Sequence, residues 1–145
     1  MKVDSGGVTL DVQVEGEGRP VVLLHGFPDS KRLWAKQVPV LRDAGFRVIV
    51  PDQRGYGDSD KPEAVDAYAI PVLAIDVTAI LDALGLERAH VGVGVLHEPV
   101  GELHEVAVGV VERPALRVHH GRSSTCRSCR GVEHRLPALV RQRTE

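Results

Sequence analysis

The sequence has 145 residues, of which 43% are hydrophobic and 26% charged, and its formal net charge is −2. This length suits one domain with a buried core, and the near-neutral charge gives no basis for nucleic acid or an anionic membrane as a partner. The two cysteines are too few for a disulfide framework, and neither a secretory signal nor a membrane-spanning run is present, so we predict a cytoplasmic protein.

Strand patterns recur through the first ninety residues. Residues 8–14 alternate apolar and polar side chains, as a half-buried strand does. Residues 21–24 and 47–50 are mostly apolar runs, which are typical of strands buried on both faces of a sheet. Residues 89–93 have the composition of a further strand.

Two segments between these strands have helical spacing. The first is predicted to be capped by Asp29 or Ser30 and to end at Gly45, and the second to begin near Pro71 and end at Gly85. Their expected apolar faces are Trp34, Val38 and Leu41 in the first helix, and Leu73, Val77, Ile80, Leu81 and Leu84 in the second. Strands alternating with helices predict an α/β fold with a mostly parallel sheet and flanking helices.

The composition changes near residue 91. Residues 91–145 contain no Asp, Asn, Lys, Ile, Met or aromatic residue, but they hold eight of the fourteen arginines and five of the seven histidines. Residues 106–111 could form a strand, whereas residues 113–145 have the low aliphatic content of disordered chains. We therefore divide the chain into residues 1–90 and a divergent part at 91–145, which we expect to be atypical or disordered.

The motif His25-Gly26-Phe27-Pro28 directly follows the first buried run. In open α/β sheets, ligands bind beyond the C-terminal ends of the strands. Glycine permits a sharp turn there and leaves backbone N–H groups unscreened, so they can donate hydrogen bonds to a developing oxyanion. An ordinary strand-to-helix turn is the alternative interpretation of the motif.

A second motif, PDQRGYGDSDKP, follows the run at 47–50. Gly55 and Gly57 permit positive φ angles, and Asp52 and Arg54 can hold the loop through charge-assisted hydrogen bonds. We predict a structural role for these four residues rather than a chemical one.

The segments VVLLHGFPDSKRLW, AGFRVIVPDQRGYGDSDKP and DALGLERAHV together resemble the N-terminal part of α/β-hydrolases, most of all epoxide hydrolases, with haloalkane dehalogenases next. The resemblance covers residues 8–91. It implies a partial α/β-hydrolase fold, a cis Phe27–Pro28 bond, an oxyanion hole using the Phe27 N–H, and a substrate site at His25, Gly26, Phe27 and Pro28. It also implies a small apolar electrophile, such as an epoxide, as substrate, a covalent ester intermediate and no cofactor.

The nucleophile elbow of that family, G-x-nucleophile-x-G after a strand, has no counterpart here. With Gly92 as its first glycine, the nucleophile position is Gly94, which has no side chain to react. No aspartate follows Asp82, and the later serines follow no predicted strand. The nucleophile and the catalytic histidine are therefore unassigned, and we expect this chain by itself to be inactive.

The C-terminal part offers one possible metal site. Cys126 and Cys129 have the spacing of zinc ligands, with His119, His120 and His134 nearby in sequence. A single C-x-x-C pair without a flanking fold favours incidental thiols, so no metal is predicted. The arginines lack aromatic residues for base stacking, which argues against nucleic acid.

Three accounts of the whole chain stay open. It is a hydrolase of the epoxide hydrolase, dehalogenase or esterase type; a truncated or frame-shifted form of such an enzyme, with residues from about 91 read in another frame; or a non-catalytic module that binds small molecules. A sheet that stops after its third or fourth strand leaves an unpaired edge, so we also expect self-association.

Overall fold

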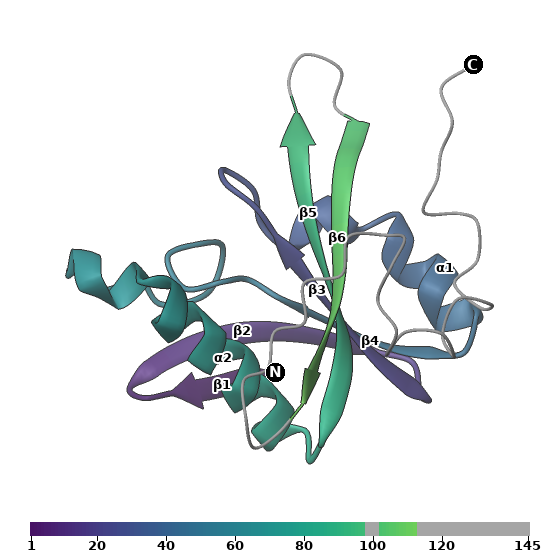
Figure 1. Ribbon diagram of the computed structural model, residues 1–145, viewed down its shortest axis with the longest axis horizontal. Helices are drawn as coiled ribbons and strands as arrows, with labels where there is room; N and C mark the ends of the chain where they lie inside the picture. The colour runs from purple at the N-terminus through teal and green to yellow at the C-terminus, as the bar shows by residue number, and fades with distance from the viewer. Residues whose placement is uncertain (98–101, 113–145) are drawn as a thin grey trace.

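The computed structural model describes residues 1–97 and 102–112, with backbone alone at 95–97 and 102–108. These residues form one six-stranded sheet of order β1-β2-β4-β3-β5-β6, shown in Figure 1. The strands are β1 (Lys2–Ser5), β2 (Val8–Glu15), β3 (Arg19–His25), β4 (Phe46–Pro51), β5 (Arg88–His97) and β6 (Glu102–Glu112). The central strand β3 is parallel to β4 and β5, and the remaining pairs are antiparallel. The predicted α/β class with a parallel centre is confirmed.

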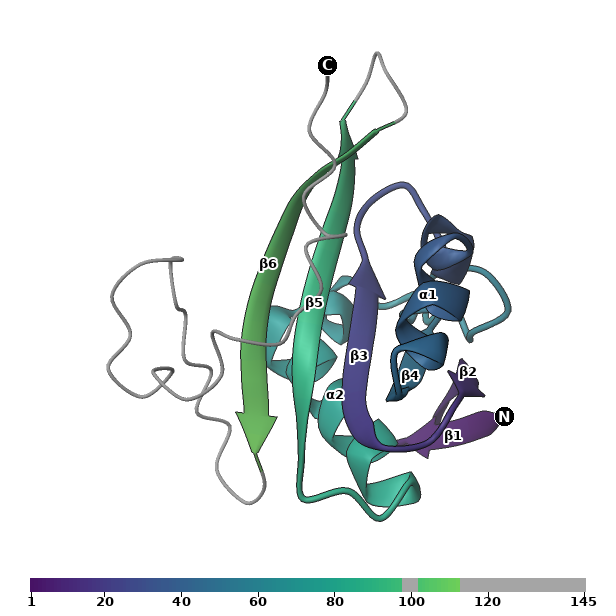
Figure 2. The same cartoon turned by 90° about the vertical axis from the view of Figure 1, so that its right-hand side faces the viewer.

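The two helices cover opposite faces of the sheet, as Figure 2 shows. Side chains of a strand alternate between the faces, so neighbouring residues of β3 enter different cores. Val22 packs in the cluster that includes Ile80 of α2 (Ile70–Ala83), and Val21 packs with Val38 of α1 (Gln37–Asp43). The expected burial of both apolar helix faces is therefore confirmed at their central positions.

The first helix differs from its prediction. Instead of one helix, the chain forms a 3-10 helix, η1 (Lys31–Trp34), which Ser30 caps, and then α1 (Gln37–Asp43). Pro39 explains the break, because its ring clashes with the carbonyl group four residues earlier, at Ala35, and it has no N–H to donate. Proline is tolerated only in the first turn of a helix, so α1 has to begin close to it.

The hairpin of β5 and β6 extends beyond the predicted strands. β5 pairs with β3 as far as Gly94, which lies opposite His25, and its backbone continues to His97. The strand predicted at 106–111 is confirmed within β6. The division at residue 91 falls inside β5, so it marks a change of composition within one strand.

β6 ends the sheet within the described ranges, so the predicted self-association concerns this edge and stays a prediction. The cysteines and histidines weighed as zinc ligands, with the rest of 113–145, lie outside the described residues. Among the helices in the described part of the chain, none has the length and apolar character needed to cross a membrane.

Candidate functional site

The two sequence motifs meet at one edge of the sheet. The HGFP turn follows β3, and the loop that begins with Asp52 follows β4. Because β3 and β4 are parallel neighbours, their C-terminal ends lie side by side, where ligands bind in open α/β sheets. The fold therefore brings together the residues that the sequence singled out separately.

His25 holds the start of the turn through its side chain. The ring is 1% exposed, its Nε2 accepts a hydrogen bond from the Gln53 N–H at 3.0 Å, and its Nδ1 lies 3.0 Å from the Gly26 carbonyl oxygen. This pattern places the ring hydrogen on Nδ1. The Gln53 side-chain amide donates to the His25 carbonyl, and the ring of Tyr56 packs edge-on against the imidazole. The imidazole thus positions the loop, and both of its nitrogens are engaged in doing so.

The turn itself presents Phe27 outward. The Asp29 N–H donates to the Gly26 carbonyl at 3.0 Å, and the Phe27–Pro28 bond is cis, as the resemblance implies. The Phe27 side chain is 78% exposed. Among residues 1–97 and 102–112, none accepts a hydrogen bond from the Phe27 N–H. This N–H is available to a ligand at the end of β3.

Asp52 holds the other end of the turn. Its carboxylate is almost fully buried, and Oδ1 accepts the Lys31 N–H at 2.8 Å. Oδ2 accepts from the Lys31 Nζ at 2.8 Å and from the Asp58 N–H at 3.0 Å. The turn is therefore fixed between consecutive residues of the β4 exit, with Gln53 at its start and Asp52 at its end.

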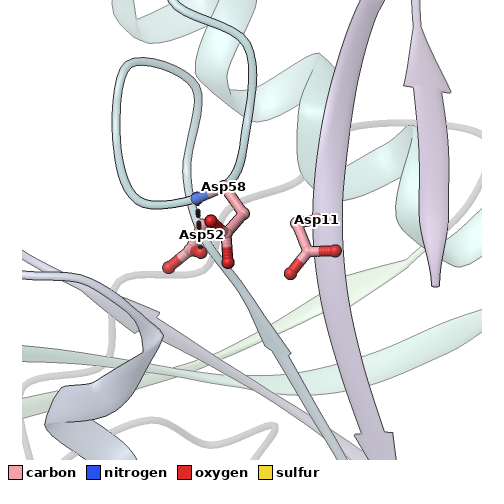
Figure 3. A group of neighbouring side chains, drawn as sticks. All are labelled: Asp11, Asp52 and Asp58. Atoms are coloured by element: carbon pink, nitrogen blue, oxygen red, sulfur yellow. Dashed lines mark hydrogen bonds between the residues drawn. The ribbon is translucent and has the colours of Figure 1, made fainter.

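Three carboxylates gather beside this anchor, and Figure 3 shows their arrangement. Oxygens of Asp11, Asp52 and Asp58 lie within 4.8 Å of one another, a spacing that could hold a metal ion. The Lys31 ammonium lies among them and forms a salt bridge with each one. Its Nζ pairs with Asp11, lies 2.8 Å from Asp52 Oδ2 and lies 3.4 Å from Asp58 Oδ2. The cationic position of the cluster is thus filled by a side chain of the protein.

The charges of this cluster stabilise one another. Burial opposes the charge of Lys31, but hydrogen bonds to Asp11 and Asp52 outweigh it and raise the lysine pKa. The hydrogen bond from Lys31 lowers the pKa of Asp11. Burial would raise the pKa of Asp52, yet the hydrogen bonds from the Asp58 N–H and from Lys31 dominate and lower it. All three groups are held in their charged forms.

The loop after β4 is shaped by its glycines. Gly57 has φ +49°, and a Cβ there would lie 2.1 Å from Asp52 Oδ2. Gly55 has φ +88°, and a Cβ there would lie 2.7 Å from Cε1 of Tyr68. The Ser59 hydroxyl closes the loop by donating to the Asp52 carbonyl at 2.6 Å. Backbone conformation and space both require glycine at these two positions.

Arg54 fastens the same loop to α2. Its Nε donates to Asp76 Oδ2 at 2.6 Å, a second guanidinium nitrogen binds Oδ1, and a third donates to the Ala67 carbonyl at 3.1 Å. The side chains of Arg54 and Asp76 are 5% and 8% exposed. The hydrogen bond to Asp76 is the main reason that the pKa of Arg54 is raised. The pair is a buried bidentate ion pair.

Comparison with known proteins identifies the fold family. The family model described as alpha/beta hydrolase fold matches residues 19–94. The chain belongs to the alpha/beta hydrolase fold family. Over 89 residues, or 60% of the chain, it is 53% identical to epoxide hydrolase A of Mycobacterium tuberculosis, and it covers 28% of that protein.

Solved structures agree with this hydrolase assignment. The crystal structure of epoxide hydrolase A from Mycobacterium thermoresistibile matches with a TM-score of 0.61 and 45% identity, over 63% of this chain and 29% of that one. An epoxide hydrolase from Vigna radiata matches with a TM-score of 0.62 and 36% identity, over 64% and 30%. The chain thus spans less than a third of the length of these relatives, and its resemblance to epoxide hydrolases is confirmed for that part.

In this hydrolase fold, β5 passes the expected position of the elbow as a strand. Gly94 pairs with His25 of β3 and with Val106 of β6, so the backbone is paired on both sides at the position where the family has its sharp elbow turn. Between Gly92 and Gly94 the only side chain is that of Val93. From Gly92 to Gly94, where the side chains of β5 are described, no nucleophilic side-chain atom is present.

Sequence reasoning missed several residues that hold the site of this hydrolase-fold chain. Asp76 had a signal, since a charged residue stands on the apolar face between Leu73 and Val77. Gln53 and Lys31 lie within the quoted segments, but no local pattern marks their roles. Their roles depend on partners 28 and 21 residues away.

We expect acid to unfold this hydrolase-fold chain partly through the carboxylate cluster. Because the folded pKa values of Asp11 and Asp52 are lowered, the unfolded chain binds more protons as the pH falls, and stability falls with it. The contribution is present above about pH 3.9 and is lost as the pH falls through the lowered folded values. Urea midpoints measured from pH 7 to about pH 2 should therefore fall less steeply in Asp11→Asn than in the parent chain.

A matched control is Asp66→Asn, which removes an exposed carboxyl group in η2 (Val65–Tyr68). This variant should keep the full acid dependence of the parent chain. Parallel curves for Asp11→Asn and Asp66→Asn would show that the cluster contributes nothing to it.

Proposed function

We propose that this chain carries the oxyanion side of an epoxide-hydrolase-like active site, with Phe27 donating its backbone N–H. The observation that carries the proposal is the turn after β3, where this N–H has no acceptor among the described residues and both ends of the turn are anchored. The named activity of the similar proteins supports a small apolar epoxide as the substrate class.

The chemistry that such a donor assists has two steps. A carboxylate attacks one carbon of the epoxide ring, the ring C–O bond breaks, the ring oxygen takes up a proton, and a covalent ester forms. Water then adds to the ester carbonyl, whose oxygen becomes negative, and the diol leaves as the carboxylate is regenerated. One fixed donor at that oxygen is worth about 2.7–4 kcal/mol of barrier. In this proposal Phe27 supplies that donor, and Gly26 and Pro28 shape the turn that carries it.

We further propose that this chain by itself does not complete the reaction, because β5 carries no nucleophile at Gly94. Incubation with styrene oxide, followed by chromatography of the diol, should give only the rate of the buffer. A full-length epoxide hydrolase assayed in parallel shows that the conditions support turnover. Diol formation that is lost on substitution of Phe27 or Pro28 would show that the chain has a nucleophile after all.

A binding module is the second candidate, and it is favoured by an anchored oxyanion turn beside a strand without a nucleophile. Such a module would bind an epoxide or its diol without converting it. Titration of the chain with styrene oxide or its diol, followed by the Phe27 amide resonance, separates the two. Saturable shifts without turnover favour the module, whereas a haloalkane dehalogenase or esterase relative would respond to a haloalkane or an ester instead.

The change of composition at residue 91 has a proposed origin in the reading frame. The family match ends at residue 94, and residues 91–145 contain no Asp, Lys, Ile or aromatic residue. Translation of the other two frames of the coding DNA after codon 90 tests this origin. A G-x-D-x-G motif followed by hydrolase sequence supports a frame shift, and its absence from all frames favours the binding module.

A further inference from the structure

We propose that Lys31 is a positioning residue of the oxyanion turn: its ammonium group is the internal cation of the Asp11, Asp52 and Asp58 cluster and fixes where the Phe27 N–H lies. This inference rests on the proposed function, because it concerns the same backbone donor. It goes beyond that function in assigning the geometry of the donor to a side chain outside the motif.

The turn that carries Phe27 is short. Residues 26–30 connect His25, which Gln53 holds, to Lys31, which Asp52 holds. These five residues have two internal hydrogen bonds, from the Asp29 N–H to the Gly26 carbonyl and from the Ser30 N–H to Asp29 Oδ1. They therefore have little freedom once both ends are fixed. The direction of the Phe27 N–H therefore depends on the anchor at each end.

Lys31 binds the Asp52 carboxylate through two of its groups. Its backbone N–H binds Asp52 Oδ1 and its Nζ binds Asp52 Oδ2, both at 2.8 Å, so one residue engages both oxygens of a buried carboxylate. The same Nζ reaches Asp11 on β2, whose carbonyl in turn accepts the Asp52 N–H at 2.9 Å. Lys31 thus ties the end of the turn to two neighbouring strands.

Without the Lys31 ammonium, the cluster would hold three negative charges close together. Three carboxylates with oxygens within 4.8 Å of one another repel, and repulsion favours protonation or rotation of Asp52 away from the Lys31 N–H. The other cation near the cluster is Lys2, which pairs with Asp11 at 3.2 Å and is 55% exposed. In the described part of the chain, Lys31 is the residue that forms a salt bridge with Asp52.

The test compares Lys31→Met with Lys36→Met, a matched change at an exposed lysine just before α1. Amide hydrogen exchange, read by NMR without substrate, reports the anchoring directly. In Lys31→Met, exchange at Asp29 should rise at least about tenfold, while Val22 in β3 keeps the parent rate. Lys36→Met should leave both rates unchanged, and Lys31→Arg should restore most of the protection at Asp29.

A second-site variant separates positioning by charge from a general packing role. In the Lys31→Met background, Asp58→Asn should recover part of the lost protection, because it removes one repelling charge. In the parent chain the same Asp58→Asn change should give no gain, since it removes a partner of Lys31. A merely structural loss of the lysine stem would show no such reversal.

Several results would overturn the proposal. One is an equal exchange rate of the Asp29 amide in Lys31→Met and Lys36→Met. Another is a rise in exchange that is spread evenly over the amides of the sheet. The third is exchange at Asp29 in Lys31→Arg that stays as fast as in Lys31→Met. If Lys31→Met does not fold, Asp11→Asn gives the weaker form of the test, since it removes one contact of the ammonium, and it should raise exchange at Asp29 by a smaller factor. Failure of the proposed function is distinguishable, because it appears as an unshifted Phe27 amide on titration with an epoxide or diol while the exchange pattern stands.

Discussion

Replacing Gly57 with alanine is expected to lower the free energy of unfolding by about 2–5 kcal/mol. The left-handed conformation at φ +49° costs a residue with a Cβ about 1–2 kcal/mol. The added carbon would also lie 2.1 Å from Asp52 Oδ2, and forcing an extra carbon into a packed site costs about 1–3 kcal/mol more. Urea denaturation of the parent chain and of Gly57→Ala measures the total loss of stability.

Gly85→Ala is the matched control for this prediction. Gly85 has φ +66° after the end of α2, and a Cβ there would have no neighbour within 4 Å. This variant should show the conformational cost alone, about 1–2 kcal/mol. Equal losses in the two variants would mean that the loop moves away from Asp52 without cost, which would contradict the tight packing described above.

Removing the Asp76 carboxylate is expected to cause the second large loss in the free energy of unfolding. Asp76→Ala leaves the Arg54 guanidinium, only 5% exposed, without its bidentate partner and away from water. Breaking a buried ion pair from one side costs about 3–5 kcal/mol, because the remaining charge is buried and uncompensated. Chemical denaturation, with circular dichroism as the probe, gives the value.

Two further variants define what this loss means. Asp43→Ala removes one of two partners of Arg42 at the surface, where Asp43 is 70% exposed and Glu15 still pairs with Arg42, and should change stability little. The double variant Arg54→Met with Asp76→Leu removes both charges and should recover part of the loss. A loss in Asp76→Ala no larger than in Asp43→Ala would show that the buried pair does not hold the loop to α2.

Both predictions concern the loop after β4, and the turn at residues 26–30 depends on that loop. Asp52 anchors Lys31 while it packs against Gly57, and Gln53 anchors His25 while the next residue, Arg54, binds α2. A disturbance of this loop should therefore reach the Phe27 N–H without any change in the HGFP motif. The turn at residues 26–30 is therefore held by residues outside it.

The sequence by itself determined the family, the strands at 8–14, 21–24, 47–50 and 89–93, and the helix that begins near Pro71. It did not predict β1 or the division of the first helix into η1 and α1. Burial on both faces of β3 and β4 follows from their apolar runs, and the buried faces of the helices follow from their spacing, because these patterns depend on neighbours a few residues away. The HGFP motif at a strand end predicted a candidate site at the edge of the sheet where the loop after β4 also lies. The break at Pro39 was also encoded locally, although the apolar spacing alone favoured a single helix.

Only the tertiary structure decided what holds that site. Lys31, Gln53 and Asp11 have partners 20 to 28 residues away, and the parallel arrangement of β3 and β4 beside β2 brings them together. The continuation of β5 past Gly94 likewise depends on pairing with β6. The physical reason is that apolar periodicity fixes which face of an element is buried, whereas the pairing of polar groups depends on which strand ends the fold places side by side.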